Sequence, residues 1–117
     1  MNIKPVELHK LLADETRLRL LVLLAREGEL CVCELTHALG EIQPKISRHL
    51  ALLREGGVVA ARRQGQWIYY RLRPDLPRWA QDVLEASARG AARLEPFVSD
   101  RAALCGMPDR PGASCCA

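Results

Sequence analysis

One helical segment, residues 42–55, constrains the fold of this chain more than any other part of its sequence. Its apolar side chains recur at helical spacing, and Pro44 stands in the first turn, where a missing backbone N–H costs no hydrogen bond. Glycines end this segment at Gly56 and the preceding helical stretch at Gly40. The sequence therefore predicts a short helix between two sharp stops, with a buried side formed by Ile46, Leu50 and Leu53.

Further helices and two strands surround this segment. Strand-like runs over residues 58–61 and 67–72 flank Gly65, a pattern typical of a β-hairpin. The remaining apolar periodicity predicts helices over residues 6–12, 14–27, 29–39 and 77–95.

This order of elements predicts a mainly α fold with a small β-hairpin wing, the winged helix-turn-helix, whose second helix enters the DNA major groove. A chain of 117 residues fits one such domain, which we expect over residues 1–96. Large apolar residues become scarce after Phe97, so residues 97–117 are expected to form a flexible, cysteine-containing tail with at most a helical turn at 100–104.

Positive charge is concentrated in the same region. Residues 43–73 carry a net charge of +6, whereas the whole chain carries +3, which favours a polyanion such as DNA as partner. At the start of the second helix, side chains suited to base edges and phosphates are Gln43, Lys45, Ser47 and Arg48. His49 is either a weak base reader or a packing residue. The hairpin tip adds Arg62, Arg63, Gln64 and Gln66 as candidate backbone or minor-groove contacts.

Targeting signals and cysteines bear on where in the cell the protein is expected. Neither a signal peptide nor a membrane span is visible, so the protein is expected in the cytoplasm. There, five cysteines are expected as thiols, which favours metal binding or redox chemistry over disulfides.

Four stretches of the chain resemble the ArsR family of metal- and metalloid-responsive repressors. They are LADETRLRLLVLL, GELCVCEL, QPKISRHLALLREGGVV and RRQGQWIYYRL. The resemblance covers about residues 5–73. It implies a homodimer, joined through the first and last helices, on a near-palindromic operator beside the genes it controls. Leu76, Val83, Leu84 and Leu94 are then either dimer contacts or core residues of one protomer.

The cysteines form two groups, and trivalent arsenic or antimony takes three soft thiolates. Arsenic-responsive members of the family carry CVC and a third cysteine three residues later, a position where this chain has Thr36. Two residues apart on a helix, Cys31 and Cys33 point to nearly opposite sides. The preferred ligands of As(III) or Sb(III) are therefore Cys105, Cys115 and Cys116, with Cys31 and Cys33 as second choice.

The predicted function is thus a metalloid-responsive transcriptional repressor without an organic cofactor. A thiol-based redox regulator using the tail cysteines and a constitutive architectural DNA binder remain as alternatives. No CxxC motif or phosphate-binding loop supports an enzyme. In the family that this chain resembles, zinc, cadmium and nickel sites use histidines and carboxylates on the last helix. Residues 77–95 contain no histidine, so the resemblance disfavours sensing of these ions.

Overall fold

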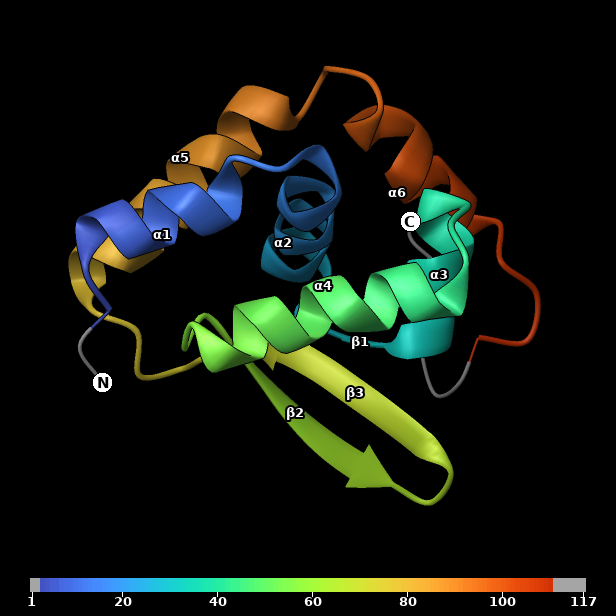
Figure 1. The fold of residues 1–117 in the computed structure, drawn as a ribbon. Helices are drawn as coiled ribbons and strands as arrows, with labels where there is room; N and C mark the ends of the chain where they lie inside the picture. Colours follow the sequence, from blue (N-terminus) through green and yellow to red (C-terminus); the bar gives the residue numbers. More distant parts are fainter. Residues whose placement is uncertain (1–2, 111–117) are drawn as a thin grey trace.

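The computed structural model describes residues 3–110. Six helices and a three-stranded sheet make up these residues (Figure 1). In chain order the elements are α1 (Pro5–Leu12), α2 (Glu15–Glu27), β1 (Glu29–Cys31), α3 (Val32–Leu39), α4 (Gln43–Glu55), β2 (Val59–Gln64), β3 (Trp67–Leu72), α5 (Arg78–Ala91) and α6 (Phe97–Cys105). No helix among residues 3–110 combines the length and apolarity needed to cross a bilayer.

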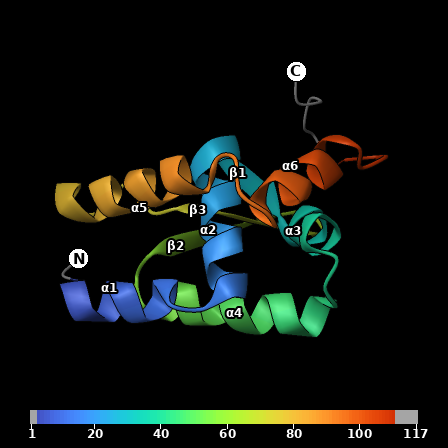
Figure 2. The same ribbon diagram turned by 90° about the horizontal axis from the view of Figure 1, so that it is seen from above.

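Helix α2 lies at the centre of the fold, with the other helices around it (Figures 1 and 2). Its N-cap Asp14 accepts a hydrogen bond from the backbone N–H of Arg17 at 3.0 Å, which satisfies a donor that the first turn leaves unpaired. Four of its leucines, Leu20, Leu21, Leu23 and Leu24, are buried and Leu18 is partly buried, as expected for a helix that is apolar almost all round. The core that they form also includes the predicted inner side of α4, namely Ile46, Leu50 and Leu53.

The sheet contains a strand that the sequence did not predict. Residues 29–31 form β1 and pair antiparallel with β3, so the expected helix over 29–39 begins only at Val32. Three residues are too few for their period to distinguish strand from helix, and pairing with β3 decides the conformation. Strands β2 and β3 form the expected hairpin, with Gly65 at φ +62° in its turn, and Figure 1 shows the hairpin projecting from the helices.

The expected flexible tail is wrong for its first part, because residues 97–105 form α6, which packs against α2 and α3 (Figure 2). Leu104 is fully buried there. Asp100, 2% exposed, accepts hydrogen bonds from Arg19 of α2 at 2.6 and 2.9 Å. The prediction from local apolar content did not include this helix, because a buried ion pair and one leucine hold it against the core.

Helix α5 ends at Ala91, earlier than the expected residue 95. Leu76 and Leu84 belong to the core of the single chain, at 4% exposure each. Leu94 is 57% exposed, and on α1 Val6 is 66% exposed. Val83 is half-buried and packs against the same core. Of the four leucine and valine positions considered for a dimer, three therefore make contacts within the protomer, and Leu94 is the exposed one.

Candidate nucleic-acid interface and thiol site

Helix α4 presents polar side chains from its first turns. Gly40, left-handed at φ +66°, ends α3 and lets the chain turn tightly into α4. Gln43 and Arg48 are exposed, and Ser47 is half-buried. Lys45, also partly exposed, forms an ion pair with Glu41 at 3.0 Å. A two-helix unit with an exposed, polar second helix has the geometry that enters a major groove.

His49 differs from this exposed set. Its side chain is buried, at 6% residue exposure, and Nδ1 lies 3.4 Å from Arg17 and 3.9 Å from Asp14. Burial lowers the pKa of His49, and the neighbouring Asp14 carboxylate opposes this only in part. The backbone N–H of Arg17 in turn lowers the pKa of Asp14. Of the two readings of His49, the geometry favours packing between α2 and α4 over contact with bases.

The hairpin divides its predicted DNA residues into two groups. Arg63, Gln64 and Gln66 are exposed at the tip. Arg62 instead donates to Glu29 of β1 at 2.6 and 2.8 Å and lies 4.6 Å from the centre of the Tyr69 ring. This bond lowers the pKa of Glu29. Arg62, whose side chain is 48% exposed, therefore links the middle of β2 to β1, and the tip residues are the better placed for phosphates.

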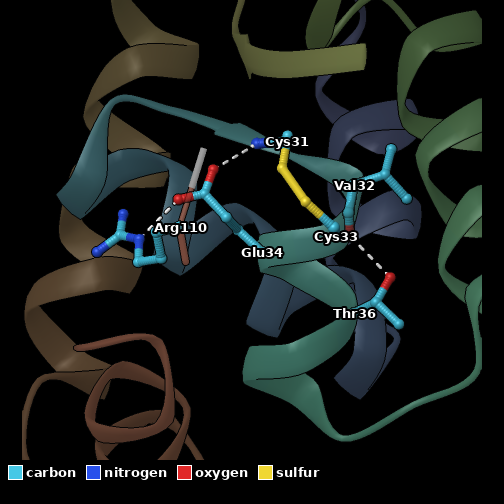
Figure 3. The surroundings of a disulfide bond; sticks show 6 residues. All are labelled: Cys31, Val32, Cys33, Glu34, Thr36 and Arg110. Atoms are coloured by element: carbon cyan, nitrogen blue, oxygen red, sulfur yellow. Dashed lines mark hydrogen bonds and ion pairs between the residues drawn. A yellow bond between two sulfur atoms is a disulfide. The ribbon is translucent and has the colours of Figure 1, made fainter. Parts of the chain in front are cut away.

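The CVC segment forms a corner, which corrects the expected geometry. Cys31 ends β1 and is the N-cap of α3 with extended φ and ψ, so the two cysteines do not lie on one helix. Their Cα atoms are 5.4 Å apart, and the sulfurs are joined in a disulfide where thiols were expected (Figure 3). The strand-to-helix turn thus brings together two sulfurs that a continuous helix would separate.

A buried carboxylate that the sequence reasoning missed holds this corner. Glu34, 1% exposed, accepts a hydrogen bond from the backbone N–H of Cys31 at 2.8 Å. Its other oxygen accepts from Arg110 at 2.7 Å (Figure 3). The position of Glu34 three residues after the N-cap is a known capping signal, but its partner 76 residues later is invisible to local patterns.

The predicted tail site lies mostly outside the described residues. Cys105 ends α6 and lines a cavity of about 340 Å³ between α2, α5 and α6, whereas Cys115 and Cys116 fall beyond residue 110. Within residues 3–110, no group of three or more His, Cys, Asp or Glu side chains is placed to hold a metal ion.

A helix-turn-helix with an exposed second helix and a basic hairpin defines a winged helix-turn-helix DNA-binding protein. Residues 14–61 match the model of the bacterial regulatory protein, arsR family. The chain is 53% identical over 107 residues to the arsenic resistance transcriptional regulator ArsR1 of Pseudomonas putida, covering 92% of this chain and 82% of that one. It is 55% identical over 85 residues to the arsenical resistance operon repressor of Escherichia coli, covering 73% of each. The protein belongs to the ArsR family of transcriptional regulators and is not an enzyme.

Solved structures support the same fold. The AntR antimony-specific transcriptional repressor has a TM-score of 0.63 at 34% identity, over 79% of this chain and 86% of that chain. A homodimeric winged helix-turn-helix domain from Mycobacterium bovis has a TM-score of 0.59 at 34% identity, over 74% of each chain. The predicted fold class is confirmed.

Proposed function

We propose that this protein is a homodimeric repressor that binds operator DNA and leaves it when As(III) or Sb(III) binds to cysteine thiolates. The observation that carries the DNA-binding half is the exposed polar start of α4 beside the projecting hairpin tip (Figure 1). The names of the relatives, which concern arsenic and antimony, support the class of ion. The exposed apolar residues Val6 and Leu94 are available to a second protomer.

Within this proposal, Cys105, Cys115 and Cys116 hold the inorganic ion. Once reduced, they can supply three thiolates, whereas the reduced CVC corner supplies two and has Thr36 at the third position. Closing a loop of this length costs about 2–3 kcal/mol, which metal–thiolate bonds exceed. Cys105 borders the cavity between α2, α5 and α6. An ion there lies beside α5, which corresponds to the predicted last helix of the domain, through which the family resemblance implies dimerisation.

The contact between Arg110 and Glu34 offers a route from this ion to the DNA. Arg110 stands between Cys105 and Cys115 in the chain, so the loop closed by the ion includes it. Its partner Glu34 anchors the start of α3, the first helix of the helix-turn-helix. A coupling of about 1–3 kcal/mol is typical, and by reciprocity operator DNA weakens ion binding equally.

The test is release of a fluorescent duplex, carrying the DNA upstream of the gene for this protein, followed by anisotropy as arsenite or antimonyl tartrate is added. Reduced wild type is compared with the Cys105→Ser/Cys115→Ser/Cys116→Ser variant and the Cys31→Ser/Cys33→Ser variant. We expect the tail variant to stay bound and the other two to dissociate. If only the Cys31/Cys33 variant stays bound, the tail assignment is wrong. If neither ion releases wild type, the inducer class is wrong.

A redox regulator is the second candidate, because the Cys31–Cys33 disulfide shows that two sulfurs can bond at the start of the helix-turn-helix. This function predicts that hydrogen peroxide releases the DNA, that dithiothreitol restores binding, and that the Cys31→Ser/Cys33→Ser variant does not respond. Release by arsenite under reducing conditions, with no effect of peroxide, excludes it.

A further inference from the structure

An apolar side chain lies at the start of α4, among the polar residues proposed to contact DNA. Ile42 is 68% exposed, more than any other large apolar side chain among residues 3–110. Gln43, which follows it, and Arg48 further along the helix are also exposed. A single exposed isoleucine is ordinary on a protein surface, so the significance of Ile42 depends on its position beside these polar residues.

Ile42 contributes little to the stability of its own protomer. It is the N-cap of α4, a position that favours serine, threonine, asparagine and aspartate because their side chains accept a hydrogen bond from the first turn. Isoleucine cannot accept this bond, and α4 has no side-chain cap at this position. The side chain is also too exposed to add to the core. Departures from a local preference without a gain in packing are expected at functional surfaces.

The backbone fixes the position of this side chain relative to α4. The Ile42 carbonyl accepts hydrogen bonds from the backbone N–H groups of Lys45 and Ile46, both at 3.2 Å. A β-branched side chain has few rotamers, so Ile42 loses little conformational freedom when a partner covers it. The first turn of α4 therefore presents a rigid apolar group to whatever approaches it.

The chemistry of the major groove identifies a partner for this group. Base edges there present hydrogen-bond donors and acceptors and one apolar group, the C5-methyl of thymine. The two charged residues nearest to Ile42 in the sequence, Glu41 and Lys45, form an ion pair at 3.0 Å and neutralise each other. An uncharged, apolar point at the start of α4 is complementary to a thymine methyl and not to a phosphate.

We infer that Ile42 is a specificity-determining residue, which packs against the methyl group of one thymine in each operator half-site. It adds an apolar contact to the polar contacts expected of its neighbours on α4. The inference rests on the proposed function, because it requires the start of α4 to lie in the major groove. A contact with the sugar–phosphate backbone would instead act equally on every sequence.

The experiment removes the methyl group from the DNA and the side chain from the protein, separately and together. In the fluorescent duplex upstream of the gene for this protein, each thymine is replaced in turn by deoxyuridine, which keeps the base pair and lacks only the methyl group. Dissociation constants of the reduced full chain are measured by anisotropy at fixed salt. We expect wild type to bind about fourfold more weakly when the contacted thymine is replaced, and about fifteenfold when both half-sites are changed, as for losing the burial of one and two methyl-sized groups.

Three variants complete the test. Ile42→Ala should bind the unmodified duplex more weakly by a similar factor and lose the sensitivity to deoxyuridine at that position, since both changes remove the same contact. Ile42→Ser should behave in the same way while supplying an N-cap, so a weaker helix start cannot explain the loss. Leu52→Ala truncates a 40% exposed side chain near the other end of α4 and is the matched control, which should keep the wild-type sensitivity.

The inference is wrong if no deoxyuridine replacement weakens wild-type binding by more than about twofold, or if Ile42→Ala keeps the wild-type sensitivity at every position. It is also wrong if Ile42→Ala weakens binding to the operator and to a scrambled duplex equally, which would indicate a backbone contact. If wild type does not prefer the operator over the scrambled duplex, the DNA-binding half of the proposed function fails together with the inference. If arsenite does not release the DNA, only the proposed inducer fails.

Discussion

The ion pair between Arg19 and Asp100 offers the sharpest test of how α6 is held. Their side chains are 13% and 3% exposed, and two hydrogen bonds join them. The pair raises the pKa of Arg19, so the guanidinium stays charged. In Asp100→Asn, one acceptor remains and an amide N–H₂ faces the guanidinium donors. Removing one partner of a buried pair costs about 3–5 kcal/mol, and the retained acceptor reduces our expectation to about 2–3 kcal/mol.

Asp82→Asn is the matched control. Asp82 makes the same kind of bond to Arg78, but these side chains are 63% and 86% exposed, so its loss should change stability by less than about 0.5 kcal/mol. Urea unfolding at one fixed protein concentration gives both values, since dimer stability depends on concentration. If Asp100→Asn costs less than about 1 kcal/mol with an unchanged denaturant slope, α6 is not held by this pair and the reasoning fails.

Three further predictions concern the site. Arg48→Ala should weaken operator binding by about 1–3 kcal/mol at fixed salt, measured by anisotropy, whereas exposed Arg93→Ala should leave it unchanged. Because burial lowers the pKa of His49, the unfolded chain binds a proton at this residue more readily than the folded chain does. The stability contributed by neutral His49 is therefore complete above about pH 6.5 and is lost as the pH falls through the lower pKa of the folded state. His49→Gln should flatten the dependence of the free energy of unfolding on pH, measured by urea titrations. Thr36→Cys, made with the three tail cysteines replaced by Ser, should give the reduced CVC corner a third thiolate and restore release by arsenite. An unresponsive variant would show that three sulfurs at this corner cannot converge on the bare ion.

The geometry of the CVC corner could not be predicted from local sequence. The CVC spacing and the substitution at Thr36 were visible in the sequence. The convergence of the sulfurs depends on β1, and β1 exists because Leu30 and Cys31 pair with Tyr70 and Tyr69 of β3. The expectation that both cysteines lie on one helix, with their sulfurs apart, was therefore wrong.

The candidate DNA surface was easier to predict because its signals are local. Glycine stops, Pro44 and the apolar spacing of α4 specify which side faces inward, and the polar residues of the first turn are then exposed by default. His49 is the exception, because its burial depends on contacts with Arg17 and the N-cap Asp14 of α2.

By itself, the sequence determined the order of the main helices, the hairpin and the polar face of α4, since these follow from backbone preferences and apolar period within a few residues. Tertiary structure decided how α6 packs against the core and how the CVC corner is anchored. Arg19 with Asp100 and Glu34 with Arg110 are pairs 81 and 76 residues apart. A charge buried away from water must find a partner, and which partner it finds depends on how distant segments pack.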